Sequence, residues 1–312
     1  MALRFEDDFL KKLEYLHVIS KRAFAGQNRA DRLARKRGRG LEFADHRQYT
    51  PGDDFRHIDW KAYKRLDRLL VRLFDEEQDL PVYLFIDASS SMSEPAKFDQ
   101  ARRIAAALCY IGLAHLDRVT ILTFGGTLGN ETVPGRGKGR IFRVFDQLER
   151  LETSGTTDLR ETFKQFASRN RQQGLAVVIS DFLDPKGFEP GLKILASMKH
   201  DVFVVHIASQ TDRNPGALGE VRYRRTVPLQ ARPDRNPGAL GEVRFVDTET
   251  GELRDVDVTP ALARAYHKIW ETHAAELELF CGRYNLGYVR ADAERAFEQI
   301  ILHTFRKGRF LA

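Results

Sequence analysis

One apolar stretch of the chain is followed by an acidic residue and two serines at alternate positions. The stretch is Val82–Ile86, and the polar residues are Asp87, Ser89 and Ser91. A short, continuous apolar run is typical of a buried central strand, and ligands of open α/β sheets bind at the carboxyl ends of such strands. One carboxylate and two hydroxyls are oxygen ligands of the kind that Mg²⁺ prefers. The alternative is that these residues cap the next helix, because Ser and Asp are favoured at helix N-caps.

Two later segments carry further oxygen donors. Asp181 follows the apolar run Leu175–Ser180, and Thr157 lies in a polar loop before a predicted helix. If the strands are parallel neighbours, Asp87 and Asp181 lie close together and repel each other unless a cation sits between them. Neutralising Asp181 is therefore expected to relieve repulsion in the metal-free protein. For the loop, the alternative is that Thr157 or Asp158 is only the N-cap of the next helix.

The order of the predicted elements defines the fold class. Strands are predicted over residues 82–86, 119–124, 175–180, 202–207 and 286–290, and helices over 97–115, 140–151, 158–173, 185–198, 259–284 and 292–305. This alternation predicts an α/β fold with a doubly wound, mainly parallel sheet flanked by helices. We assign residues 79–312 to this domain and residues 1–78 to an N-terminal extension that begins with an amphipathic helix.

The extension contains a basic segment and a polar, turn-rich segment. The basic segment, Arg29–Arg39, has six basic residues and one acidic residue. Nucleic-acid binding is one interpretation, but a solvated linker is favoured because no aromatic residues interleave for base stacking. In the turn-rich segment, residues 38–61, arginines and carboxylates are mixed. This mixture predicts Arg–carboxylate pairs, with Tyr49, Phe55 and Trp60 as buried anchors.

The composition is typical of a globular protein without membrane spans. The chain has 312 residues, 42% hydrophobic and 30% charged, and its apolar runs are too short to cross a bilayer. It has two cysteines and no signal-peptide pattern at its start, so we expect a reducing, cytoplasmic location. The net charge of +6 permits an acidic partner without requiring one.

An internal duplication stands out near the middle of the predicted domain. Asp212–Arg222 recurs unchanged as Asp234–Arg244, with a period of 22 residues. Repeat folds need at least three copies. We therefore interpret residues 209–245 as a duplicated surface insertion, which a fold tolerates at a modest cost.

Two sets of motifs resemble known families. Asp87-x-Ser89-x-Ser91, the loop ending in Thr157-Asp158-Leu159, and Asp181 resemble the metal-ion-dependent adhesion site of von Willebrand factor A domains. The segments Gly40–Phe43, Arg47-x-Tyr49, Pro51–Asp54 and Arg56–Trp60 are similar to the bacterial family called domain of unknown function 58. The two resemblances together cover roughly residues 39–305, although the duplication departs from the family pattern.

The resemblance implies a Mg²⁺ or Mn²⁺ site with Ser89 and Ser91 as direct ligands. Thr157 would bind directly or through water, as would Asp87 and Asp181; whether Thr157 or the adjacent Thr156 faces the metal stays open. An open coordination position would accept a carboxylate from a partner protein, and MoxR-type AAA+ ATPases are the implied partner. We thus expect a metal-dependent adaptor that is not an enzyme.

The rival function is a Mg²⁺-dependent phosphatase or hydrolase with Asp87 as the nucleophile. Such chemistry usually employs a second acid two residues later, where this chain has Ser89. A serine hydrolase is disfavoured because the chain has no Gly-x-Ser-x-Gly elbow. We expect no catalytic residues.

Overall fold

The computed structural model describes residues 8–19, 37–38, 42–51, 53–75, 81–114, 118–132, 137–169, 172–213, 220–223, 242–247, 253–257 and 259–307. The chain divides into two compact units. The larger unit comprises Met1–Val18 and Leu80–Phe310, and the smaller unit comprises Ile19–Asp79 with Leu311–Ala312.

A six-stranded sheet forms the centre of the larger unit. Its strands are β4 (Pro81–Asp87), β5 (Arg118–Phe124), β6 (Leu128–Thr132), β7 (Leu175–Ser180), β8 (Asp201–Ala208) and β12 (Gly287–Asp292). They lie in the order β12-β8-β7-β4-β5-β6, and every neighbouring pair is parallel except β5 with β6. β4 is buried along its whole length between β5 and β7. The predicted α/β class with a mainly parallel sheet is confirmed.

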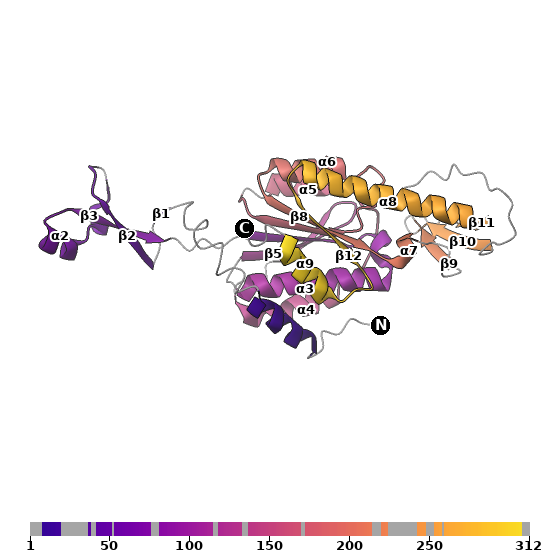
Figure 1. Cartoon of the computed structure of the whole chain (residues 1–312), viewed down its shortest axis with the longest axis horizontal. Coiled ribbons are helices and arrows are strands. Elements are labelled where there is room, and N and C mark those ends of the chain that lie inside the picture. The colour runs from indigo at the N-terminus through magenta and orange to yellow at the C-terminus, as the bar shows by residue number, and fades with distance from the viewer. Residues whose placement is uncertain are drawn as a thin grey trace. The chain divides into compact units, whose positions relative to one another are not determined.

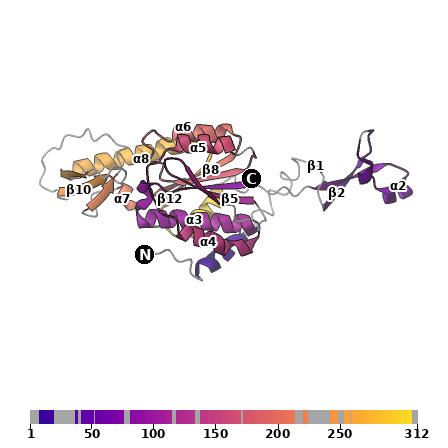
Figure 2. The same ribbon diagram turned by 180° about the vertical axis from the view of Figure 1, so that it is seen from behind.

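Helices cover both faces of this sheet (Figures 1 and 2). One face carries α3 (Pro95–Ala114), α4 (Ile141–Glu149) and α9 (Phe297–Lys307), and the other carries α5 (Leu159–Arg169), α6 (Glu189–Ser197) and α8 (Pro260–Arg283). α6 begins later than predicted because the Asp184 carboxylate accepts a hydrogen bond from the Lys186 backbone N–H (2.8 Å) and holds a turn there. Among the described residues, no helix has the length and apolar character that crossing a bilayer requires.

The N-terminal helix, residues 8–19, groups with the larger unit, whereas the sequence placed it in the extension. Phe9 packs against Phe145 of α4 and Phe297 of α9, with ring centroids 5.9 and 4.8 Å apart. Leu13 and Leu16 are completely buried. This apolar stripe is what an amphipathic helix buries against a domain core, and that burial explains the difference from the expected boundary at residues 78 and 79.

The smaller unit is built on a three-stranded antiparallel sheet. Its strands are β1 (Arg37–Gly38), β2 (Glu42–Gln48) and β3 (Leu70–Asp75), in the order β1-β3-β2, and η1 (Phe55–His57) and α2 (Trp60–Leu66) connect β2 to β3. The predicted basic segment, Arg29–Arg39, lies outside the described residues apart from β1.

Ion pairs hold the turn-rich segment of the smaller unit together, as predicted. Arg47 binds Asp53 at 2.7 Å, and the Arg56 guanidinium binds both carboxylate oxygens of Asp54. Asp59 caps α2 by accepting hydrogen bonds from two backbone N–H groups. Its other oxygen contacts the His46 ring at 2.9 Å, so one carboxylate joins α2 to β2.

Of the three predicted aromatic anchors, Tyr49 is half-buried, and the predicted burial is wrong for Phe55 and Trp60. Phe55 is 69% exposed and Trp60 is 57% exposed. Ile58 and Ala62 are the buried residues of this segment, and Ile58 forms a β-bridge with Val71. The aliphatic residues Ile58 and Ala62 are therefore buried in this segment, while the rings of Phe55 and Trp60 face solvent.

The duplicated segment contributes a second, smaller sheet to the larger unit. After α7 (Gln210–Arg213), the strands are β9 (Glu220–Tyr223), β10 (Glu242–Asp247) and β11 (Leu253–Asp257). β9 and β10 contain the last residues of the two copies and pair in parallel, with Glu220 opposite Arg244. β10 and β11 pair as an antiparallel hairpin. The duplication has thus placed two copies of one strand side by side.

The start of the segment differs from the expected surface insertion. Ser209 is completely buried, and its backbone N–H donates to the Asp212 carboxylate (2.9 Å). Arg213 is paired with Asp292 of β12. The Arg213–Asp292 pair ties this start of the segment to the main sheet, so residues 209–213 are part of the packed domain and not of a surface insertion.

We predict that deleting Arg213–Asp234 leaves a folded protein. The deletion removes β9 but keeps Asp212, keeps the β10–β11 hairpin, and puts Arg235 in the sequence position of Arg213. Circular dichroism and thermal unfolding should show a native spectrum and a cooperative transition. The same deletion with Asp212→Asn is the control and should unfold at a lower temperature. An insoluble or molten single-copy protein would contradict this account.

Candidate functional site

β4 ends in Asp87, whose side chain is completely buried at the carboxyl edge of the sheet. Its Oδ2 accepts a hydrogen bond from Ser180 Oγ (2.5 Å), and its Oδ1 accepts one from the Ser89 backbone N–H (2.9 Å). Burial, together with the negative charge of Asp181, raises the pKa of Asp87 to about 6. A charged Asp87 is therefore costly unless a positive charge lies nearby.

The two serines that follow Asp87 bring their hydroxyls together. Ser89 Oγ and Ser91 Oγ are 2.9 Å apart and share a hydrogen bond. Ser89 is buried and Ser91 is half-buried in the short turn before α3. Octahedral Mg²⁺ holds its ligands at about 2.0–2.1 Å, so neighbouring ligands are about 2.9 Å apart. The two hydroxyls have the spacing of two adjacent ligands.

The loop that contains Thr157 is joined to the loop after β4 by backbone hydrogen bonds. The Ser154 N–H donates to the Ala88 carbonyl (2.7 Å), and the Ser90 N–H donates to the Gly155 carbonyl (2.9 Å). Gly155 has φ of +73°, a conformation that glycine adopts without strain. Of the two threonines that follow, Thr156 is exposed and Thr157 is buried.

Asp158 makes a capping contact at the start of α5. Its Oδ1 accepts a hydrogen bond from the Glu161 backbone N–H (2.8 Å). Its Oδ2 accepts one from the Lys186 ammonium (2.5 Å). Capping therefore accounts for Asp158. Because Thr157 is buried beside the exposed Thr156, the structure favours Thr157 over Thr156 as the candidate ligand.

Asp181 is hydrogen-bonded to a buried lysine, Lys97. Its Oδ2 accepts a hydrogen bond from Lys97 Nζ (2.8 Å), and its Oδ1 accepts one from the Leu183 backbone N–H (3.1 Å). Lys97 Nζ also donates to Asp212 Oδ1 (3.0 Å). Burial lowers the pKa of Lys97, but the carboxylates of Asp181 and Asp212 outweigh that effect and leave the pKa raised.

This lysine changes one expectation from the sequence. The ammonium of Lys97 partly compensates the repulsion between Asp87 and Asp181. We therefore no longer expect the metal-free protein to become more stable when Asp181 is neutralised. Removing one partner of a buried ion pair instead leaves the other partner buried and less well compensated, which is strongly destabilising.

The structure thus brings four predicted residues, Asp87, Ser89, Ser91 and Asp181, into one linked set of contacts, with Thr157 on the adjoining loop. Sequence reasoning missed three further residues: Lys97, Ser180 and Asp212. Lys97 did carry a signal, because helical spacing places it on the same face of α3 as the buried residues Ala101, Ile104 and Leu108.

The donor set suits a hard cation. Two carboxylates and three hydroxyls offer oxygen alone, the ligand type of Mg²⁺ and Mn²⁺. In the part of the chain that the structure describes, no group of three or more His, Cys, Asp or Glu side chains is arranged to hold a metal. A cation here would depend on Ser89, Ser91 and Thr157 as much as on carboxylates.

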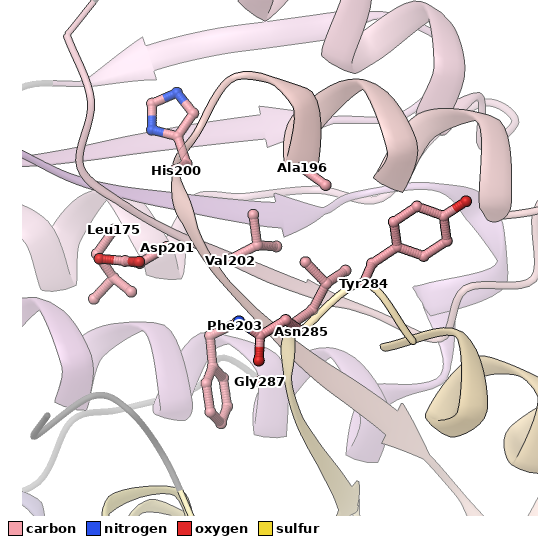
Figure 3. A pocket seen from close by; sticks show the side chains of 10 residues that line it. Leu175, Ala196, His200, Asp201, Val202, Phe203, Tyr284, Asn285 and Gly287 are labelled. Atoms are coloured by element: carbon pink, nitrogen blue, oxygen red, sulfur yellow. The ribbon is translucent and has the colours of Figure 1, made fainter. Parts of the chain in front are cut away.

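A cavity of about 140 Å³ lies at the amino ends of β7 and β8, the edge opposite Asp87 (Figure 3). Its lining includes His200, Asp201, Tyr284 and Asn285. The ring of His200 has a structural role, because its Nδ1 accepts a hydrogen bond from the Gly174 backbone N–H (3.1 Å). Burial lowers the pKa of His200, which favours the neutral ring. This cavity does not gather the oxygen donors found at the other edge.

Comparison with known proteins places the chain among bacterial relatives. It is 25% identical over 272 residues to the uncharacterized proteins Rv1480 of Mycobacterium tuberculosis and Mb1516 of Mycobacterium bovis, which covers 85% of this chain and 78% of each relative. An aerotolerance-related membrane protein from Bacteroides fragilis is 15% identical, with a TM-score of 0.39. The conserved hypothetical protein BatB from Bacteroides thetaiotaomicron is 16% identical, with a TM-score of 0.38. Both structural matches cover 73% of this chain and all of the solved chain.

The family match confirms the resemblance found in the turn-rich segment. The model of the family "Protein of unknown function DUF58" matches residues 45–227. This range includes the motifs from Arg47 to Trp60, β4, β7 and all five candidate metal ligands, while Gly40–Phe43 lies before it. This match covers more than half of the 312 residues, and the chain belongs to the DUF58 family.

Proposed function

We propose that this protein is a protein-interaction module whose binding depends on Mg²⁺ or Mn²⁺ held by Asp87, Ser89, Ser91, Thr157 and Asp181. The spacing of the two serine hydroxyls beside two buried carboxylates carries this proposal. A bound ion would supply a Lewis-acidic position for a carboxylate of the partner. The chain's own residues would hold the ion and fix the two loops around it through the backbone bonds between residues 88–90 and 154–155.

The burial of Asp87 supports a binding function over a catalytic one. A carboxylate nucleophile must reach its substrate, whereas the Asp87 side chain is completely buried and both of its oxygens accept hydrogen bonds. Ser180 and Ser89, which make these contacts, are buried as well. Asp87 is therefore better suited to orienting the serine loop and balancing charge than to attacking a substrate.

We further propose that the partner is an AAA+ ATPase of the MoxR type and that the protein works as its adaptor in the cytoplasm. Family resemblance is the reason for naming this partner. The exposed rings of Phe55 and Trp60 support a second contact surface in the smaller unit, because aromatic side chains are enriched where proteins bind each other.

We predict that Asp181→Asn abolishes most of the stabilisation by Mg²⁺. If only the folded wild type binds the ion, Mg²⁺ at ten times its Kd adds ~1.4 kcal/mol to the free energy of unfolding. That gain raises the Tm of a unit of this size by roughly 3–6 °C. In EDTA, Asp181→Asn should unfold below wild type because it breaks the buried pair with Lys97, a loss of up to about 3–5 kcal/mol.

Asp184→Asn is the matched control for this experiment. Asp184 is a buried carboxylate three residues away, but it accepts hydrogen bonds from the Leu159 and Lys186 backbone N–H groups. This variant should lose stability and still respond to Mg²⁺. A full Mg²⁺ response in Asp181→Asn would remove Asp181 from the site, and a wild type that ignores Mg²⁺ would contradict the proposed function.

We also predict that the full chain hydrolyses para-nitrophenyl phosphate no faster than buffer does, with or without Mg²⁺. The reason is the buried, hydrogen-bonded state of Asp87. The release of nitrophenolate measures the rate, and Asp87→Asn is the control. Steady turnover by wild type that disappears in Asp87→Asn would support the phosphatase instead.

A further inference from the structure

Lys97 differs from the other lysines that form ion pairs in the described part of the chain. It is the third residue of α3, and its side chain is 2% exposed. Lys12, Lys186 and Lys193 form ion pairs with side chains that are 44–70% exposed. Burying an ammonium is unfavourable unless the site returns strong hydrogen bonds and opposite charge. The need for a charged, soluble surface therefore does not explain why a lysine occupies this buried position.

All three N–H groups of the Lys97 ammonium have acceptors. These are the Ser91 carbonyl oxygen at 3.2 Å, Asp181 Oδ2 at 2.8 Å and Asp212 Oδ1 at 3.0 Å. Ser91 and Asp181 are both candidate metal ligands. An ion held by these residues would therefore share the Asp181 carboxylate with the Lys97 ammonium.

Asp212 connects this ammonium to the corner between β8 and α7. Its Oδ2 accepts a hydrogen bond from the Ser209 backbone N–H (2.9 Å). The Ser209 hydroxyl in turn donates to Glu94 Oε2 (2.7 Å), just before α3. Asp212 is held in place by this corner, so its charge faces Lys97 at a fixed position.

We propose that Lys97 is a built-in counter-cation that limits the affinity of the site for Mg²⁺, and that Asp212 moderates this effect. The proposal rests on the metal site proposed above. Lys97 compensates the charge of Asp181 when no ion is bound. When Mg²⁺ shares Asp181, the two positive charges repel each other, and Asp212 weakens that repulsion by drawing the ammonium toward itself.

The signs of two substitutions follow from this arrangement. Lys97→Met keeps a long apolar stem but removes the competing charge, so Mg²⁺ should bind more tightly. Asp212→Asn removes the charge of the second carboxylate, so the Lys97 ammonium should interact more strongly with Asp181. Mg²⁺ should then bind more weakly. A purely structural Lys97, needed only to hold Asp181 in place, predicts the opposite result for Lys97→Met.

Titration calorimetry of MgCl₂ into the EDTA-stripped full chain, at fixed ionic strength, tests the proposal. We expect the Kd of Lys97→Met to fall about tenfold or more and that of Asp212→Asn to rise by roughly threefold or more, since charges at this range act strongly when buried. Lys193→Met is the matched control, because Lys193 forms an exposed pair with Glu189. Its Kd should stay within about twofold of wild type, as expected for a screened surface charge.

An unchanged or higher Kd in Lys97→Met would overturn this inference and leave the metal site itself standing. If Lys97→Met does not fold, the Kd of Asp212→Asn tests the inference instead. An unchanged or lower Kd for Asp212→Asn would overturn the inference. Absence of Mg²⁺ binding by wild type would contradict the proposed function, whereas binding by Lys97→Met alone would still support Lys97 as the competing cation. Absence of binding by both proteins would overturn both proposals.

Discussion

The larger unit buries two carboxylates, Asp87 and Asp181, at the ends of neighbouring parallel strands. Removing such groups from water costs several kcal/mol each unless hydrogen bonds and positive charge compensate. Ser180 and the Ser89 backbone N–H supply hydrogen bonds to Asp87, and Lys97 supplies charge to Asp181. The turn after β4 and the first turn of α3 are shaped by this compensation, because both carry groups that contact the carboxylates or Lys97.

The parts of this arrangement that depend on local sequence could be predicted. β4 and β7 are continuous apolar runs because parallel strands are covered on both faces. Parallel pairing of β4 with β7 then places Asp87 and Asp181 at the same edge, whichever helices surround them. Alternation after the strand brings the Ser89 and Ser91 hydroxyls together within a single turn.

Contacts between distant segments could not be predicted from one sequence. Lys97 is 84 residues from Asp181 and 115 residues from Asp212, and no local pattern specifies either pairing. The exposure of single side chains was equally hard to predict. Trp60 has the large aromatic side chain typical of a core residue, but it lies on the outer side of α2. Ion pairs in the smaller unit were easier to predict, because Asp54 and Arg56 are only two residues apart in the sequence.

The central claim is that the Asp87 edge of the sheet holds a divalent cation between the serine hydroxyls and the carboxylates. Anomalous scattering from a crystal of the full chain grown with MnCl₂ tests this claim most directly, because it locates the metal itself. The account predicts a manganese peak within about 2.0–2.3 Å of both Ser89 Oγ and Ser91 Oγ. No peak there, with Lys97 still bonded to Asp181 and the two hydroxyls still bonded to each other, would contradict it.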